Sequence, residues 1–167
     1  MGEDYLPLGD TNVSTIVWSV LGAIADRTSE ALRALYTGFD HPLSADAATT
    51  LDGLDTAALV LAHGDEVAGT YPEGAFPERL AELARLVKAD VGLRVACVDM
   101  GGWDMHTNLG TIDGGAMTTE LTKLGEGLAA FCQDLGDRLD EVTVVVMTEF
   151  GRRVEQNANA GTDHGHG

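Results

Sequence analysis

The first half of the chain carries apolar residues at helical spacing. Thr28 is a good N-terminal cap for one helix, and Pro77 suits the first turn of another. The polar residues around His41 and the stretch 69–74, which contains glycine and proline, predict loops. Apolar side chains recur every three or four positions in four segments and predict a helix in each: 13–24, 28–36, 54–67 and 77–90.

The second half alternates between strand and helix patterns. Residues 93–98 are a short apolar run of strand type, a glycine-rich loop follows over 99–115, and leucines spaced by threes and fours predict a helix over 121–139. Residues 142–148 form a β-branched run that is too continuous for a half-exposed strand, so we predict a buried central strand. Strand, helix and strand in this order form a βαβ unit, whose strands are almost always parallel.

These patterns predict the α/β fold class and one incomplete domain. We expect a helical, variable region over 1–75 and a βαβ core over 76–167, which would be part of a doubly wound parallel sheet. Ligands of such sheets bind beyond the carboxyl ends of the strands. The loops that follow the two predicted strands leave the same edge of the sheet, so their polar side chains are candidates for one shared site.

The loop after the first predicted strand contains a carboxylate and an imidazole two residues apart. In an extended loop Asp104 and His106 would point the same way and could bind one metal ion. Alternatively, Asp104 accepts backbone hydrogen bonds in a turn and His106 is solvated. Trp103 is expected to anchor the loop by packing.

The segment after the second predicted strand places Glu149 where α/β enzymes carry functional carboxylates. The alternative is an ordinary surface glutamate that begins a helix. Arg152 and Arg153 are candidates for binding an oxyanion in a bidentate manner, and at least one of them is expected to pair with nearby acidic groups.

The last residues of the sequence form the strongest local signal. Asp163, His164 and His166 stand among glycines, which let a backbone approach a ligand closely. Aspartate oxygens and histidine nitrogens are common ligands of zinc and manganese, so we predict a divalent metal ion as cofactor. A solvated tail or an engineered scar would have a similar composition. The full set of candidate metal ligands is Asp104, His106, Glu149, Asp163, His164 and His166.

The charge of the chain limits its partners. Its 167 residues include 27 acidic and 10 basic ones, a formal net charge of -17 that repels nucleic acids and anionic membrane surfaces. A small anionic substrate would need metal cations to invert the local field. The apolar run 16–25 is about half as long as a bilayer span, and the N-terminus shows no basic leader. Cys97 and Cys132 lie in apolar patterns and are expected to be small core residues.

Several well-known catalytic motifs are missing from the sequence. It contains no Gly-rich phosphate-binding loop with Lys-Ser/Thr, no dinucleotide fingerprint, no Gly-x-Ser-x-Gly elbow and no Cys-x-x-Cys pair. Covalent catalysis therefore has no evident nucleophile, and the catalytic residues are unknown at this stage.

Three motifs carry a resemblance to a known family. They are Gly-Gly-Trp-Asp-Met-His (101–106), Thr-Glu-Phe-Gly-Arg (148–152) and Gly-Thr-Asp-His-Gly (161–165), and in order and spacing they resemble the bacterial domain-of-unknown-function family fifteen-oh-one. The resemblance is closest from Pro77 onward. That family is placed in the alkaline phosphatase and sulfatase superfamily, whose doubly wound α/β core holds a two-metal centre.

The resemblance implies roles for particular residues. Asp104 and His106 look like ligands of one metal, Glu149 stands where the superfamily has an Asp-His ligand pair, and His164 looks like a late metal ligand. The implied function is metal-dependent hydrolysis of phosphate or sulfate esters, with a small anionic ester as substrate and export to the periplasm for complete members. The alternative is a non-catalytic binding or assembly scaffold.

Complete members of the family have segments on both sides that have no counterpart here. We therefore expect the chain to be an internal part of a longer protein that is inactive by itself. Its sheet would lack edge partners and expose apolar surface, so we also expect self-association.

Overall fold

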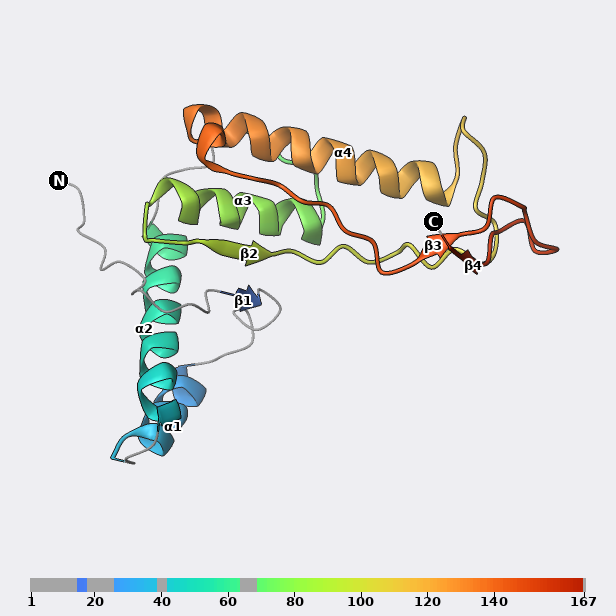
Figure 1. The fold of residues 1–167 in the computed structure, drawn as a ribbon. Coiled ribbons are helices and arrows are strands. Elements are labelled where there is room, and N and C mark those ends of the chain that lie inside the picture. The colour runs from blue at the N-terminus through green and yellow to red at the C-terminus, as the bar shows by residue number, and fades with distance from the viewer. Residues whose placement is uncertain (1–14, 18–25, 39–41, 64–68, 167) are drawn as a thin grey trace. The chain divides into compact units, whose positions relative to one another are not determined.

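The computed structural model describes residues 15–17, 26–38, 42–63 and 69–166 (Figure 1). The chain divides into two compact units. Unit 1 comprises Met1–Ala68 and Glu78–Val98, and unit 2 comprises Gly69–Pro77 and Asp99–Gly167. The described chain contains both helices and sheet, which agrees with the predicted α/β class at this coarse level. The described residues form two two-stranded sheets and no doubly wound sheet.

Unit 1 is built on helices. Its helices are α1 (Asp26–Tyr36), α2 (Pro42–His63) and most of α3 (Ala75–Lys88). Ala57, Val60, Leu86 and Val91 form its fully buried core, to which α2 contributes two residues one helical turn apart. The amphipathic helix predicted over 77–90 is confirmed as α3.

The first two helices differ from their predicted bounds. The second predicted helix is confirmed as α1, although it begins at Asp26 and not after Thr28. Helix α2 begins at Pro42, well before residue 54, because proline suits a first turn. Its first half has little apolar periodicity, and threonine hydroxyls along the helix donate to carbonyls four residues back. These pairs are Thr49 to Ala45, Thr50 to Asp46 and Thr56 to Asp52.

A short parallel pair of strands completes unit 1. Strand β1 (Thr15–Val17) pairs with β2 (Val95–Cys97), Ile16 being opposite Ala96. The helix predicted over 13–24 is therefore wrong at residues 15–17, and its other positions lie outside the described residues. A Thr-Ile-Val run is β-branched throughout and favours a strand once a partner is available. The strand predicted over 93–98 is confirmed in shorter form, and Cys97 on it is exposed, not in the core.

Unit 2 is organised by one long helix. Helix α4 (Ala116–Leu135) continues into the 3₁₀ turn η1 (Gly136–Glu141), which confirms the helix predicted over 121–139. The buried end of α4 includes Phe131 and Asp134, and the hydroxyl of Tyr71 donates to Asp134 Oδ2 at 3.0 Å. Cys132 on the same helix is half-buried. Among the described helices, none is long and apolar enough to cross a bilayer.

The buried central strand predicted over 142–148 is wrong in the described structure. Val142 is extended (φ -114°, ψ 129°), yet no residue of this run pairs in a sheet, and Val145 and Met147 are 71% and 86% exposed. A central strand needs hydrogen-bonding neighbours on both sides, and the described residues provide none for this run. Within the part of the chain that the structure describes, the predicted βαβ unit is consequently not formed.

The last regular elements bring two distant stretches of unit 2 together. Strand β3 (Gly151–Arg152) pairs antiparallel with β4 (His164–Gly165), and Arg152 is opposite His164. This short ladder lies at the end of the extended run in Figure 1. It places the two C-terminal motifs beside each other.

Candidate functional site

The site is built where two loops run side by side in unit 2. Residues 105–109 and 159–162 are joined by backbone hydrogen bonds, and Thr107 forms an isolated antiparallel bridge with Ala160. The bonds run from Thr162 N to Met105 O at 3.3 Å, from Asn108 N to Asn159 O at 3.0 Å, and from Leu109 N to Ala160 O at 2.8 Å. This pairing brings the Trp-Asp-Met-His loop against the Gly-Thr-Asp-His loop.

Gly161 makes this close approach possible. A Cβ added to it would collide with the backbone of His106 and of Thr107. Backbone atoms cannot move aside as the end of a flexible side chain can, so the position accepts only glycine. The sequence predicted that glycines here allow a close approach, and at Gly161 the structure gives the reason.

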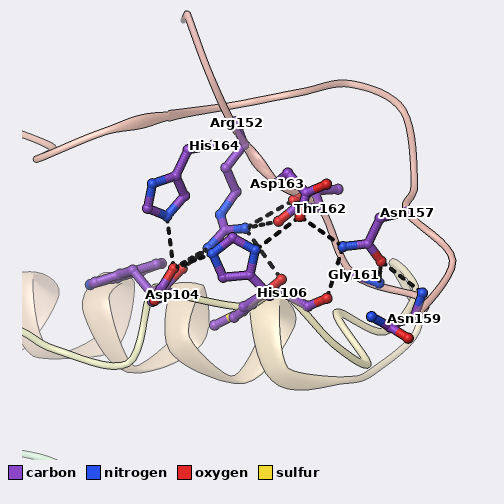
Figure 2. Close-up of polar contacts among 11 residues, drawn as sticks. Asp104, His106, Arg152, Asn157, Asn159, Gly161, Thr162, Asp163 and His164 are labelled. Carbon is purple, nitrogen blue, oxygen red and sulfur yellow. Dashed lines mark hydrogen bonds and ion pairs between the residues drawn. The ribbon is translucent and has the colours of Figure 1, made fainter.

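Asp104, His106 and His164 form the centre of the site (Figure 2). Asp104 Oδ1 lies 3.0 Å from His106 Nε2 and 2.8 Å from His164 Nε2. One ligand atom from each residue lies within 4.8 Å of the others, and all three side chains are partly exposed. A carboxylate and two imidazoles at this spacing are a donor set that can hold one metal ion.

Asp163 binds the other nitrogen of His106. Its Oδ1 lies 3.0 Å from His106 Nδ1 and also accepts a hydrogen bond of 3.0 Å from Asn157 Nδ2 (Figure 2). The hydrogen bond with His106, followed by that from Asn157, lowers the pKa of Asp163. The charged carboxylate only accepts, so this contact is a hydrogen bond when His106 carries a proton on Nδ1.

Asp104 is likewise held in its charged form. The hydrogen bond with His164 lowers the pKa of this carboxyl, and the charges of His106 and Arg152 act in the same direction. Each ring nitrogen of His106 therefore faces a carboxylate. A neutral imidazole has one N–H, so with Nδ1–H directed to Asp163 the lone pair of Nε2 faces Asp104. The lone pair of Nε2 and the carboxylate of Asp104 would repel each other, and a cation bound to both, either a proton or a metal ion, removes this repulsion.

Aromatic contacts fix the second imidazole. The ring of His164 stacks on Phe150, with centroids 3.9 Å apart and planes at 13°. The ring of His106 also lies near His164, with its centroid 4.9 Å from that of His164 and its plane tilted by 33°. Stacking of this kind restricts the rotation of His164 and keeps its Nε2 near Asp104.

Arg152 ties the two loops together. Its guanidinium donates to the carbonyls of Trp103 and Thr162, to the carbonyl of Met105 at 3.2 Å and to the Thr162 hydroxyl at 3.1 Å. Its side chain is 15% exposed, and its Nη2 lies 3.7 Å from Asp104 Oδ1. The structure therefore uses Arg152 mainly to bind backbone carbonyls.

The other predicted site residues lie at the margin of this group. Glu149 and His166 are exposed and do not belong to the three-residue donor set. Arg153 is exposed, its backbone N–H donates to Asp163 O at 2.9 Å, and its charge contributes to the lowered pKa of Asp163. Trp103 is half-buried, in keeping with an anchoring role.

Two residues of the site were not predicted from the sequence. Phe150 was not singled out inside the Glu-Phe-Gly-Arg motif, and Asn157 was counted only as part of a polar loop. A signal for Asn157 was present, because asparagine often binds the backbone N–H two residues on. It does so here with Asn159 N at 2.9 Å.

Comparison with known proteins identifies the family. No curated protein and no solved structure matches the chain. The family described as protein of unknown function (DUF1501) matches residues 24–167, which include all three motifs and every residue of the site. The chain belongs to the DUF1501 family, as the resemblance of its motifs predicted.

Proposed function

We propose that Asp104, His106 and His164 bind one divalent transition-metal ion, with zinc and manganese as first candidates. The observation that carries this proposal is the meeting of one carboxylate oxygen and two imidazole nitrogens within 4.8 Å. Oxygen and nitrogen ligands of this kind suit both metals.

The surroundings of the donor set support a cation. Two carboxylates flank His106, and a proton on Nδ1 would leave Nε2 with a lone pair directed at Asp104. The second carboxylate, Asp163, stands where metal-binding histidines commonly have a hydrogen-bond acceptor. A bound metal ion would require a neutral His106 that offers Nε2 as a ligand.

We further propose that the centre serves metal-dependent hydrolysis of phosphate or sulfate esters. A metal bound there would polarise an ester oxygen and offset its negative charge. With its net charge of -17 the protein by itself would repel an anionic ester, so this role requires the bound cation. The resemblance of the motifs to the alkaline phosphatase and sulfatase superfamily points to the same chemistry and to a doubly wound fold for the complete protein.

We propose further roles for the candidate residues that lie outside the three-residue donor set. Glu149 and His166 are exposed beside the motifs and are our candidates for a second ion, while Arg153 is the candidate for the anionic group of the substrate. Arg152 is a weaker candidate because its guanidinium binds carbonyls.

A second function, a non-catalytic scaffold, is favoured by one observation. The hydroxyl of Thr162 in the site is 7% exposed and hydrogen-bonded to Arg152, so it is not placed as a free nucleophile. This alternative predicts a preserved fold without bound metal and without turnover of esters.

Metal titration tests the proposal directly. Competition with a chromophoric chelator measures zinc and manganese affinity for the full chain and for Asp104→Ala and His164→Ala. His63→Ala is the matched control, since His63 is an exposed histidine at the end of α2 in unit 1. We expect stoichiometric binding that the two site variants lose and the control keeps. Absence of binding by the unsubstituted protein would reject the proposal. A folded, unsubstituted protein that binds neither metal would favour the scaffold.

A further inference from the structure

The side-chain amide of Asn157 uses all of its hydrogen-bonding capacity inside the site. Its Nδ2 donates to His106 O at 2.9 Å and to Asp163 Oδ1 at 3.0 Å. Its Oδ1 accepts from Asn159 N at 2.9 Å and from Gly161 N at 3.0 Å. An amide has two donor hydrogens and two acceptor lone pairs, and all four are engaged here.

These contacts fix which way the amide points. If it flipped, its oxygen would face the carbonyl of His106 and the carboxylate of Asp163, and its nitrogen would face two backbone N–H groups. All four hydrogen bonds would be lost, so the orientation follows from the network. Figure 2 shows the amide between the two loops.

Through this orientation Asn157 acts on His106 by way of Asp163. Asp163 Oδ1 receives hydrogen bonds from both Asn157 Nδ2 and His106 Nδ1, each at 3.0 Å. A carboxylate oxygen fixed by one donor presents itself to the second donor in a defined position. The proton of His106 is then kept on Nδ1, and Nε2 is left as the metal-binding atom.

We propose that Asn157 is a positioning residue of the metal centre, which sets the tautomer and the ring orientation of His106 through Asp163 while it joins the two loops. This inference rests on the metal-binding function proposed above. It assigns Asp163 to holding His106, in place of direct ligation.

Two substitutions separate the positioning role from the turn that Asn157 forms. Asn157→Ala removes every side-chain contact. Asn157→Ser keeps a hydroxyl that can accept from Asn159 N, but the shorter side chain cannot reach Asp163. Asn159→Ala is the matched control, because Asn159 is exposed and contributes its backbone N–H to the network.

Zinc affinity is the first measurement. We expect Asn157→Ala and Asn157→Ser to weaken zinc binding about 10- to 100-fold, as the loss of outer-shell partners of ligating histidines does. Asn159→Ala should bind as the unsubstituted protein does. Circular dichroism verifies folding, and Asn157→Ser carries the test if Asn157→Ala does not fold. A folded Asn157→Ser protein with unchanged zinc affinity would overturn the inference.

The tautomer of His106 is the second measurement, and it needs no metal. Nitrogen-15 NMR of the metal-free protein at about pH 8, where an ordinary imidazole is neutral, should show the proton of His106 on Nδ1. In Asn157→Ser the proton should redistribute toward Nε2, which a purely structural role would not cause. An unchanged tautomer overturns the inference. If the unsubstituted protein binds no zinc but the tautomer shifts as expected, the metal proposal fails and the positioning by Asn157 stands.

Discussion

His106 Nδ1 lies 3.0 Å from Asp163 Oδ1, although the two residues are 57 positions apart in the sequence. The contact joins the first histidine motif to the last one within unit 2. It leaves the opposite ring nitrogen, Nε2, directed at Asp104.

Asp163 should matter for metal binding even though it lies outside the donor set. In Asp163→Asn the new amide can donate a hydrogen bond to His106 as well as accept one, so it no longer favours a proton on Nδ1. We expect zinc affinity to fall about 10- to 100-fold, measured by chelator competition. Asp113→Asn, an exposed aspartate in the same unit, serves as the control. Equal loss in both variants would contradict a specific role for Asp163.

Gly161 should tolerate no side chain. In Gly161→Ala the Cβ would collide with the backbone of His106 and Thr107, so the two loops must separate. We expect a loss of about 1–3 kcal/mol in the free energy of unfolding, the usual cost of overpacking, together with the loss of zinc binding. Gly101→Ala is the matched control because a Cβ there meets nothing within 4 Å. Urea unfolding of both variants measures the difference, and similar midpoints would refute the prediction.

Arg152 should act as a loop clamp and not primarily as an anion site. Arg152→Lys keeps the charge but loses the planar fork that reaches several carbonyls at once. We expect it to destabilise unit 2 by about 2 kcal/mol and to weaken zinc binding. Arg153→Lys, at the neighbouring exposed position, should leave both unchanged. A stable Arg152→Lys protein with intact zinc affinity would show that the clamp is dispensable.

Tyr71 should make the protein sensitive to alkaline pH. Burial raises the pKa of Tyr71 above its ordinary value of 10.0, and the hydrogen bond to Asp134 and its charge act in the same direction. Above about pH 10 the unfolded chain releases this proton before the folded one, so the stabilisation is fully present below that pH and declines above it.

The matching experiment is urea unfolding of Tyr71→Phe across that pH range. At neutral pH the variant should lose about 1–2 kcal/mol, because Asp134 loses a hydrogen-bond donor. Its stability should then decline less between about pH 10 and 12 than that of the unsubstituted protein. Tyr36→Phe, which changes an exposed tyrosine, should retain the full alkaline decline. Identical pH profiles for Tyr71→Phe and the unsubstituted protein would argue against the role of this pair.

The exposed run 142–147 should promote self-association, as expected from the sequence. Its residues are apolar or uncharged, its backbone pairs with no described strand, and Val145 and Met147 are largely exposed. We expect two copies to pair through this run, and lysine at an exposed strand edge opposes such pairing. Light scattering after gel filtration should show a lower mass for Val145→Lys/Met147→Lys than for the unsubstituted protein. A monomeric unsubstituted protein would contradict the prediction.

Parts of the site could be predicted because the residue types and spacings within short motifs already indicate metal ligands. Asp104, His106, Asp163 and His164 were singled out by residue type and spacing, and the structure brings these four together. The use of Arg152 could not be predicted, because its partners are carbonyls contributed by a different loop. Asn157 was missed because three of its hydrogen-bond partners, His106 O, Asp163 Oδ1 and Gly161 N, come within reach only when the turn after Asn157 forms and the two loops meet.

The sequence by itself determined the helices α3 and α4, the irregular loop between β2 and α4, and the identity of the candidate ligands. A helix satisfies its hydrogen bonds within a few residues, so its apolar period is enough to predict it. Only the tertiary structure decided that residues 15–17 are a strand, that residues 142–148 are left unpaired, and that the rings of His106 and His164 meet at Asp104. A strand and a polar cluster both need partners from distant parts of the chain, and a local pattern does not specify where those partners are.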